Sequence, residues 1–291
     1  MTGITVRPSG RSLGADIEGV DLSQPIDDAT FGQILDAWAE HLVLRFRGQK
    51  LTDDQLAEFS ARFGALDDAP IRATGTPQHD RRRDIAVISN IVEGDKPVGS
   101  LGNSELVWHQ DMSYKDLPPK ASILYGVETP ATGGNTEFYN LYKAYETLPD
   151  DLKQRIQGLK IKHDATRNSA GQARVGMEGQ YTNEERPGAI HPLVARHPMT
   201  GKPSLYIGRR PNAWIVGLSD EESEQLLDQL WDHIHKSDHT WAQEWQSGDV
   251  VLWDNRCTLH RRGPLDPSQR RRMHRTQIRD EARPAAPQSL L

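Results

Sequence analysis

His109 and Asp111 stand two residues apart in the segment WHQDMSY, a spacing at which an imidazole and a carboxylate can bind one metal ion. On a β-strand, residues i and i+2 point to the same face, so the two side chains can converge on one point. A His-x-Asp pair is weak evidence by itself, because a chain with 11 histidines is expected to contain roughly one such pair by chance. A third ligand would make the interpretation specific.

A later segment supplies a candidate for that third ligand. Residues 250–253 have the apolar composition of a buried strand, and the turn-forming pair Asp254-Asn255 follows them before His260. Two imidazoles and one carboxylate leave the opposite side of a metal open, which is the arrangement of non-haem Fe(II) oxygenases. A closed structural zinc site is disfavoured, because it needs four protein ligands, usually including thiolates, and Cys257 is the single cysteine.

Composition limits the classes of protein that need to be considered. The 291 residues carry a net charge of -6, from 35 Lys and Arg against 41 Asp and Glu, so no nucleic-acid partner is expected. A basic run near the C-terminus keeps nucleic-acid binding open as an alternative. The single cysteine excludes an intrachain disulfide, and no secretory or membrane-spanning segment is evident. We therefore expect a cytoplasmic protein without a membrane partner.

Helical spacing and capping residues predict helices over 27–38, 52–63 and 219–234. Short strands are predicted at 42–46, 85–89, 122–127, 204–208 and 250–253. Long helices do not alternate with these strands as they do in a βαβ sheet. The pattern therefore favours a mainly β fold with peripheral α-helices, either a β-sandwich or a jelly roll.

Residues 1–281 are expected to form one domain, because no internal repeat or low-complexity segment divides them. Residues 164–189, rich in Gly, Asn, Glu and Gln, predict a long loop that could cover a site as a lid. The Pro- and Ala-rich residues 282–291 are expected to form a flexible C-terminal tail. We also expect a homo-oligomer.

An ordered set of motifs covers nearly the whole chain. In chain order they are LGADIEGVDL at 13–22, His109-x-Asp111, GGNT at 133–136, HPL at 191–193, WDNR at 253–256, His260, Arg271 and Arg275. The set resembles the taurine dioxygenase/2,4-dichlorophenoxyacetate dioxygenase (TauD/TfdA) family of Fe(II)/2-oxoglutarate-dependent dioxygenases. The resemblance implies a double-stranded β-helix core, which is a cupin-like jelly roll. It also implies an enzyme that uses Fe(2+), 2-oxoglutarate and O2.

The resemblance implies His109, Asp111 and His260 as the iron ligands at the catalytic centre. It implies that the hydroxyl of Thr136 and the guanidinium of Arg271 bind 2-oxoglutarate. A guanidinium presents a planar fork that matches a carboxylate. The sequence does not decide which of three consecutive arginines, Arg270, Arg271 or Arg272, points inward, because a one-residue slip along a strand changes the face.

The resemblance also implies a small anionic organic substrate, whose charged group Arg275 would bind. Glu105, Trp108 and Tyr114 are further candidate substrate contacts. Glu105 occupies the position where taurine-specific members carry an asparagine that helps hold the substrate, which argues against taurine. Trp108 and Tyr114 would belong to the pocket wall, or else to the core. Segments 203–209 and 253–257 look more like the branch that hydroxylates aryloxyalkanoates next to the ether oxygen and so cleaves them. The alternatives are a taurine/alkylsulfonate or alkylsulfate dioxygenase and a catalytically inactive metal-binding jelly-roll module.

Overall fold

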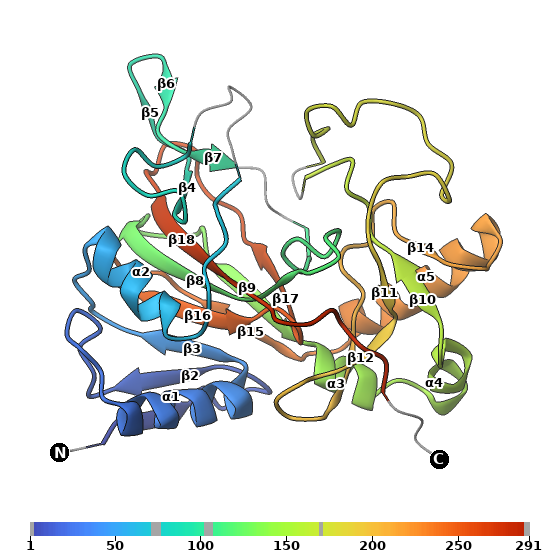
Figure 1. Ribbon diagram of the computed structural model, residues 1–291, viewed down its shortest axis with the longest axis horizontal. Coiled ribbons are helices and arrows are strands. Elements are labelled where there is room, and N and C mark those ends of the chain that lie inside the picture. The colour runs from blue at the N-terminus through green and yellow to red at the C-terminus, as the bar shows by residue number, and fades with distance from the viewer. Residues whose placement is uncertain (1–2, 71–76, 102–106, 169–170, 288–291) are drawn as a thin grey trace.

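The structure is a computed structural model that describes residues 3–70, 77–101, 107–168 and 171–287. Within these ranges, an eight-stranded sheet in the order β1-β2-β3-β16-β8-β18-β4-β7 packs against a three-stranded sheet in the order β15-β9-β17 (Figure 1). The larger sheet consists of β1 (Thr5–Pro8), β2 (Ala15–Glu18), β3 (Val43–Phe46), β16 (Val250–Asp254), β8 (Pro119–Glu128), β18 (Arg272–Arg279), β4 (Ala86–Ser89) and β7 (Ser100–Leu101). The smaller sheet consists of β15 (Thr240–Gln243), β9 (Thr136–Asn140) and β17 (Thr258–Arg262).

Strand β16 shows how the sequence builds this sandwich, because all of its residues are buried. Val250 and Leu252 pack into a cluster on the outer face of the larger sheet, whereas Val251 and Trp253 pack between the two sheets. Side chains alternate along a strand, so a strand that is covered on both faces needs a continuous apolar run. Phe138 of β9 packs against Trp253 from the opposite sheet.

Helices α1 (Asp28–His41) and α2 (Asp53–Ala61) cover the outer face of the larger sheet. Asp27 caps α1 by accepting a hydrogen bond from the backbone of Thr30. Thr52 and Gln55 form the predicted capping box at the start of α2. Each helix buries one mainly apolar face, so tertiary packing reinforces these local start signals.

The outer face of the smaller sheet is covered by α3 (Leu141–Glu146), α4 (Asp150–Ile156) and α5 (Asp220–Lys236). Tyr139 and Leu259 of the sheet pack into the same cluster as Leu230 and Trp231 of α5. Three shorter sheets complete the described strands. They are β11 (Ile190–Pro192), β10 (Lys160–Lys162) and β14 (Trp214–Ile215); β12 (Val194–Arg196) and β13 (Pro203–Leu205); and β5 (Val92–Glu93) and β6 (Lys96–Pro97).

The expected mainly β fold with peripheral helices and a jelly-roll core is confirmed. Helices α1, α2 and α5 begin at the predicted capping residues, and β3, β4, β8, β13 and β16 overlap the predicted strands. The short helices α3 and α4 were not predicted, because six or seven residues are too few to establish a helical period.

The described residues of the predicted loop, 164–168 and 171–189, contain no helix and no named strand. A single β-bridge between Arg167 and Ala173 joins its first part. Closure of this loop over the site stays a prediction. In the C-terminal tail, the carbonyl of Ala285 accepts a hydrogen bond of 2.8 Å from the backbone of Arg196, and residues 288–291 lie outside the described part. Among the described helices, none has the length and apolar character needed to cross a bilayer.

Candidate metal centre

The two predicted histidine ligands meet in the space between the sheets. His260 lies on β17, and its backbone pairs with that of His109: each N–H donates to the carbonyl of the other, at 2.9 and 3.0 Å. The centroids of the two imidazole rings are 4.2 Å apart. The ring of His260 also lies 4.9 Å from that of Trp253, which belongs to the core between the sheets. Backbone pairing therefore brings together two residues that are far apart in the sequence.

Asp111 completes a cluster of three buried candidate ligands. Its Oδ1 lies 3.8 Å from Nε2 of His109 and 3.9 Å from Nε2 of His260. These separations are too long for hydrogen bonds. The three atoms lie within reach of one common metal ion, and two imidazoles with one carboxylate suit Fe(II). The donor set and its geometry thus fit the metal that the motifs imply.

The surroundings of both imidazoles suit metal binding. Nδ1 of His109 lies 2.9 Å from the carbonyl of Val107, to which it donates, so the lone pair on Nε2 faces the cluster. Burial and the neighbouring His109 lower the pKa of His260 to about 3. The His260 ring is therefore neutral near pH 7 and can act as a ligand without first losing a proton.

The carboxylate of Asp111 is held from behind by two side chains of the larger sheet. Ser122 Oγ donates to Oδ2 at 2.9 Å, and Nη1 of Arg275 donates to Oδ1 and Oδ2 at 3.2 and 3.3 Å. Burial alone would raise the pKa of Asp111, but the charge of Arg275 and the hydrogen bond from Ser122 help to lower it below its usual range. The carboxylate is therefore ionised.

Arg275, predicted to bind the primary substrate, is buried on β18 directly beside Asp111. Its Nε atom has no hydrogen-bond partner among the described residues. The guanidinium thus contacts the metal carboxylate and still has a buried donor for another acceptor. Its contact with Asp111 was not predicted, because that contact depends on how β18 packs over a segment far away in the sequence.

Burial distinguishes the three consecutive arginines. Arg271 is only 4% exposed, and its backbone exchanges hydrogen bonds with Asn90. Arg270 and Arg272 both point toward the carboxylate of Glu128. Nε of Arg270 lies 2.5 Å from Oε1, and Nη2 of Arg272 lies 3.8 Å from Oε2. Arg271 is therefore the inward-facing member, and its role in binding 2-oxoglutarate stays a prediction.

Thr136 lies on β9, two residues before Phe138 and therefore on the same face of the strand. Phe138 is the residue that pairs with His260 on β17. Its hydroxyl accepts a hydrogen bond of 3.0 Å from Nε1 of Trp245. An accepting hydroxyl retains its own proton, so Thr136 can still donate to a ligand oxygen. This geometry suits the predicted contact with 2-oxoglutarate, which stays a prediction.

Of the three other predicted substrate contacts, Glu105 lies outside the described residues. Trp108 is buried in the cluster with α5, and its ring packs edge-on against Tyr139, an arrangement that favours a structural role. The hydroxyl of Tyr114 is in the field of Asp111 and Arg275, and burial raises its pKa. The substrate contacts of these three residues stay predictions.

Arg174, which lies in the long loop, was not among the predicted site residues. Its guanidinium lies 4.2 Å from the centroid of the Tyr114 ring. Arg209 supports the start of the same loop by donating to the carbonyls of Asp164, Arg167 and Asn168. No local signal marks Arg174, because its partner lies on a different part of the chain.

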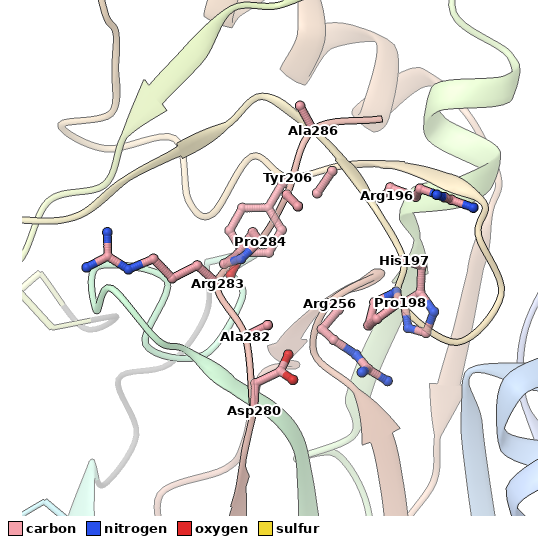
Figure 2. A pocket seen from close by; sticks show the side chains of 12 residues that line it. Arg196, His197, Pro198, Tyr206, Arg256, Asp280, Ala282, Arg283, Pro284 and Ala286 are labelled. Carbon is pink, nitrogen blue, oxygen red and sulfur yellow. The ribbon is translucent and has the colours of Figure 1, made fainter. Parts of the chain in front are cut away.

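A separate cavity of about 320 Å³ lies beneath the C-terminal segment, and none of the three candidate ligands lines it. Figure 2 shows Tyr206 beside the segment that runs from Asp280 to Ala286, with His197 and Arg256 close by. His197 and Arg256 both bind the carboxylate of Asp254, at 3.0 and 2.6 Å. The cavity therefore borders the ion pairs that brace the turn between β16 and β17.

A family model described as taurine catabolism dioxygenase TauD, TfdA family, matches residues 5–277. The chain is 33% identical to pentalenolactone F synthase of Streptomyces avermitilis, over 97% of this chain and 96% of that protein. It is also 33% identical to the (S)-phenoxypropionate/alpha-ketoglutarate-dioxygenase of Sphingobium herbicidovorans, over 94% of each chain. A solved taurine dioxygenase from Burkholderia xenovorans is 32% identical, with a TM-score of 0.79 over 98% of this chain and 92% of that chain.

The family match and the relatives cover nearly the full chain, and the family's cofactors fit the buried cluster of two imidazoles and a carboxylate. The chain therefore belongs to the TauD/TfdA family and is an Fe(II)-, 2-oxoglutarate- and O2-dependent dioxygenase.

Proposed function

We propose that the chain oxidises a small anionic substrate, and that this substrate is an aryloxyalkanoate-type carboxylate. Fe(II), 2-oxoglutarate and O2 supply the oxidising power: one oxygen atom enters a C–H bond of the substrate and the other enters succinate, while 2-oxoglutarate loses CO2. Hydroxylation of the carbon next to the ether oxygen gives a hemiacetal-type product, which breaks down to a phenol and an oxo acid.

The unpaired donor of Arg275 carries the proposal that the substrate is anionic. The guanidinium is buried, and Asp111 engages only its Nη1 in the hydrogen bonds of the described residues. Nε is buried and has no hydrogen-bond partner among the described residues, which is costly unless a ligand accepts a hydrogen bond from it. A substrate carboxylate would satisfy this donor and would lie close to the metal carboxylate, as reaction at a neighbouring C–H bond requires.

Tyr114 and Arg174 favour an aromatic group on the substrate. The phenol ring lies close enough to the metal cluster for the charges of Asp111 and Arg275 to act on its hydroxyl. Arg174 adds a cation stacked on the same ring. An aryl ether could pack against Tyr114 while its carboxylate binds Arg275, with the loop that carries Arg174 acting as a lid. The two relatives compared above are equally identical to this chain, so identity alone does not choose between their substrates.

For the cosubstrate, we propose that Arg271 pairs with the distal carboxylate of 2-oxoglutarate and that Thr136 donates its hydroxyl proton to it. Both side chains are buried. Gly134 has φ +63°, and a Cβ added there would lie 3.4 Å from Cδ of Arg271, so the GGNT segment fits closely around this arginine. Trp245 orients the Thr136 hydroxyl by donating to its oxygen.

Succinate release tests the substrate class directly. A panel should contain phenoxypropionate enantiomers, 2,4-dichlorophenoxyacetate, taurine, other alkylsulfonates and alkylsulfates. We expect the highest kcat/KM for an aryloxyalkanoate, together with release of a phenol. Tyr114→Leu should reduce kcat/KM for aryl substrates more than for alkyl substrates. Succinate release with sulfonates or sulfates alone would overturn the aryloxyalkanoate proposal and leave the dioxygenase reaction intact.

A taurine/alkylsulfonate dioxygenase is the second candidate, favoured by the similarity to the solved taurine dioxygenase. A sulfonate could also accept the hydrogen bond from Nε of Arg275. Sulfite release from taurine, with no phenol release from aryl ethers, would establish this candidate.

The expected cytoplasmic homo-oligomer without a nucleic-acid partner also stays a prediction. The basic run is partly neutralised, since Arg261 pairs with Glu137 and Arg270 with Glu128. Sedimentation velocity would give the oligomeric state. Retention on a polyanion column at low salt would contradict the expectation of no nucleic-acid partner.

A further inference from the structure

We propose that Asn255 is a positioning residue that sets the place of the Asp111 carboxylate, although it touches neither metal nor substrate. Asn255 is fully buried in the turn between β16 and β17. Its Oδ1 accepts a hydrogen bond of 2.7 Å from the backbone N–H of Asp111, and its Nδ2 donates to the carbonyl of Asp111 at 2.9 Å. One amide side chain thus binds both backbone polar groups of the ligand residue.

The remaining donor of Asn255 is also used. Nδ2 donates to the carbonyl of Pro119 at 2.9 Å, at the start of β8. The side chain therefore makes three hydrogen bonds in a fully buried place, where an unpaired amide atom would be costly. Pro119 anchors the clamp on the same strand that supplies Ser122, the hydroxyl donor to the Asp111 carboxylate. Strand β8 therefore supports Asp111 twice, through the Pro119 carbonyl that Asn255 binds and through the Ser122 hydroxyl.

Asp111 needs such a clamp because no sheet holds its backbone. It lies outside the named strands, and the bridge between His109 and His260 is its nearest β-pairing in the described chain. The next residue, Met112, has φ +49°, a conformation that is costly for a residue with a side chain. The segment therefore turns away from the sheet directly after the carboxylate, where the amide of Asn255 replaces strand pairing.

Gln110, between the two ligands of the His-x-Asp pair, completes the clamp. Its Nε2 donates to the carbonyl of Asn255 at 2.9 Å, and its Oε1 accepts from the backbone of Gly208 at 2.9 Å. Gln110 is thus hydrogen-bonded to the main chain of Asn255, and Asp111 is hydrogen-bonded to its side chain. His260 follows Asn255 by five residues. The turn that contains Asn255 therefore leads directly into β17, the strand that carries His260.

The inference rests on the metal centre and is independent of which substrate is oxidised. A shift of Asp111 by a fraction of an ångström would change its distances from the two imidazole nitrogens, which are now nearly equal at 3.8 and 3.9 Å. Residues that orient metal ligands typically change metal affinity by about 10- to 100-fold when they are replaced. We expect an effect of this size on metal binding, even without substrate or O2.

Mn(II) binding to the metal-free protein, followed by electron paramagnetic resonance, tests this role without turnover. Asn255→Asp has the same shape, but it replaces the two donors with a carboxylate oxygen. We expect its Mn(II) affinity to fall about 10- to 100-fold, and the visible spectrum of its Co(II) form to change. The matched control is Asn140→Asp, at a buried asparagine that caps α3 and donates to the carbonyl of Ser12. The control should change Mn(II) affinity by less than about threefold.

Wild-type affinity and spectrum in Asn255→Asp would overturn the proposal. Asn255→Ser, which is neutral and smaller, is the second variant in case the aspartate prevents folding. Its Mn(II) affinity should also fall, while circular dichroism stays like that of the wild type. Loss of folding in both variants, with Asn140→Asp folded, would show a general role in the fold and would also overturn the proposal. Failure of the wild-type protein to bind Mn(II) would instead contradict the metal centre itself.

Discussion

Among the described residues, two clusters consist of one aspartate and two histidines, yet only one of them has a geometry that suits a metal. In the cluster of Asp53, His79 and His274, the carboxylate lies 2.8 Å from one imidazole and 2.6 Å from the other, which are hydrogen bonds. In the cluster around Asp111, the corresponding distances are 3.8 and 3.9 Å. The carboxylate and imidazoles of the first cluster form hydrogen bonds with one another. In the second cluster, Oδ1 of Asp111 and the two imidazole Nε2 atoms lie near a common point without bonding to one another.

The partners of the imidazoles explain the difference. Nδ1 of His79 lies 3.2 and 3.1 Å from the backbone N–H groups of Arg81 and Arg82, and it must accept from both. The ring proton is then on Nε2, where it is donated to Asp53, and no lone pair is left for a metal. His109 has the opposite arrangement, because its Nδ1 donates to a carbonyl. The backbone atoms behind an imidazole therefore decide whether it can be a ligand.

Removing a ligand should have the largest effect and gives the strongest test of this contrast. We expect His109→Ala or Asp111→Ala to abolish turnover and Mn(II) binding, because a ligand is lost. His79→Ala is the matched control and should keep metal binding. The measurement is the visible charge-transfer band of the anaerobic complex with Fe(II) and 2-oxoglutarate. A band that persists in Asp111→Ala and disappears in His79→Ala would reverse our assignment.

Arg275→Ala should have the next largest effect, on the stability of the metal-free protein. It removes the cation beside a buried carboxylate, a change that typically costs about 3–5 kcal/mol. Metal binding restores a positive partner to Asp111, so excess Mn(II) should recover part of the lost stability. Urea unfolding with and without Mn(II) measures both effects. Equal destabilisation in both conditions would mean that Arg275 does not act through Asp111.

Arg271→Ala should mainly weaken binding of 2-oxoglutarate. A charge-assisted hydrogen bond to a carboxylate contributes about 1.5–3 kcal/mol, which corresponds to about a 10- to 150-fold rise in KM for 2-oxoglutarate. Arg270→Ala is the control, because Arg270 is exposed and pairs with Glu128. An unchanged KM in Arg271→Ala would show that another residue binds the cosubstrate.

The smallest effect should come from the cluster of Asp53, His79 and His274, whose side chains hydrogen-bond to one another. Burial lowers the pKa of His274, despite the opposing influence of Asp53, so the folded state disfavours its protonated form. A lowered pKa makes the unfolded state bind more protons, so stability is lost as pH falls below the ordinary histidine value. His274→Gln should therefore reduce the loss of stability between about pH 7 and pH 5, by about 1 kcal/mol or less. Thermal unfolding across this range would measure it, and an unchanged pH dependence would contradict it.

Local signals predicted part of this molecule well. The capping pairs Thr52/Gln55 and Ser219/Glu222 locate two helices, because a cap and the residue three positions later act within one turn. The candidate iron ligands and Arg271 were predicted from an ordered set of motifs rather than from spacing alone, and their roles stay predictions.

Long-range contacts were not predicted, although they complete the site. Asn255 was interpreted as a turn residue and a member of the WDNR motif, but its contact with Asp111 was not predicted, because their hydrogen bonds join segments 144 residues apart. The stacking of Arg174 on Tyr114 and the bridging of two histidines by Asp53 have the same origin. Single-sequence patterns report on neighbours along the chain, and these contacts depend on the packed fold.

Strand β18 links the two clusters, because His274 faces Asp53 on the outer side and Arg275 faces Asp111 on the inner side. Moving this strand by one position against β8 would exchange the two faces and bring an imidazole to the Asp111 carboxylate in place of the guanidinium. Inserting or deleting a single residue at positions 273–275 should consequently be tolerated far less than point substitutions there.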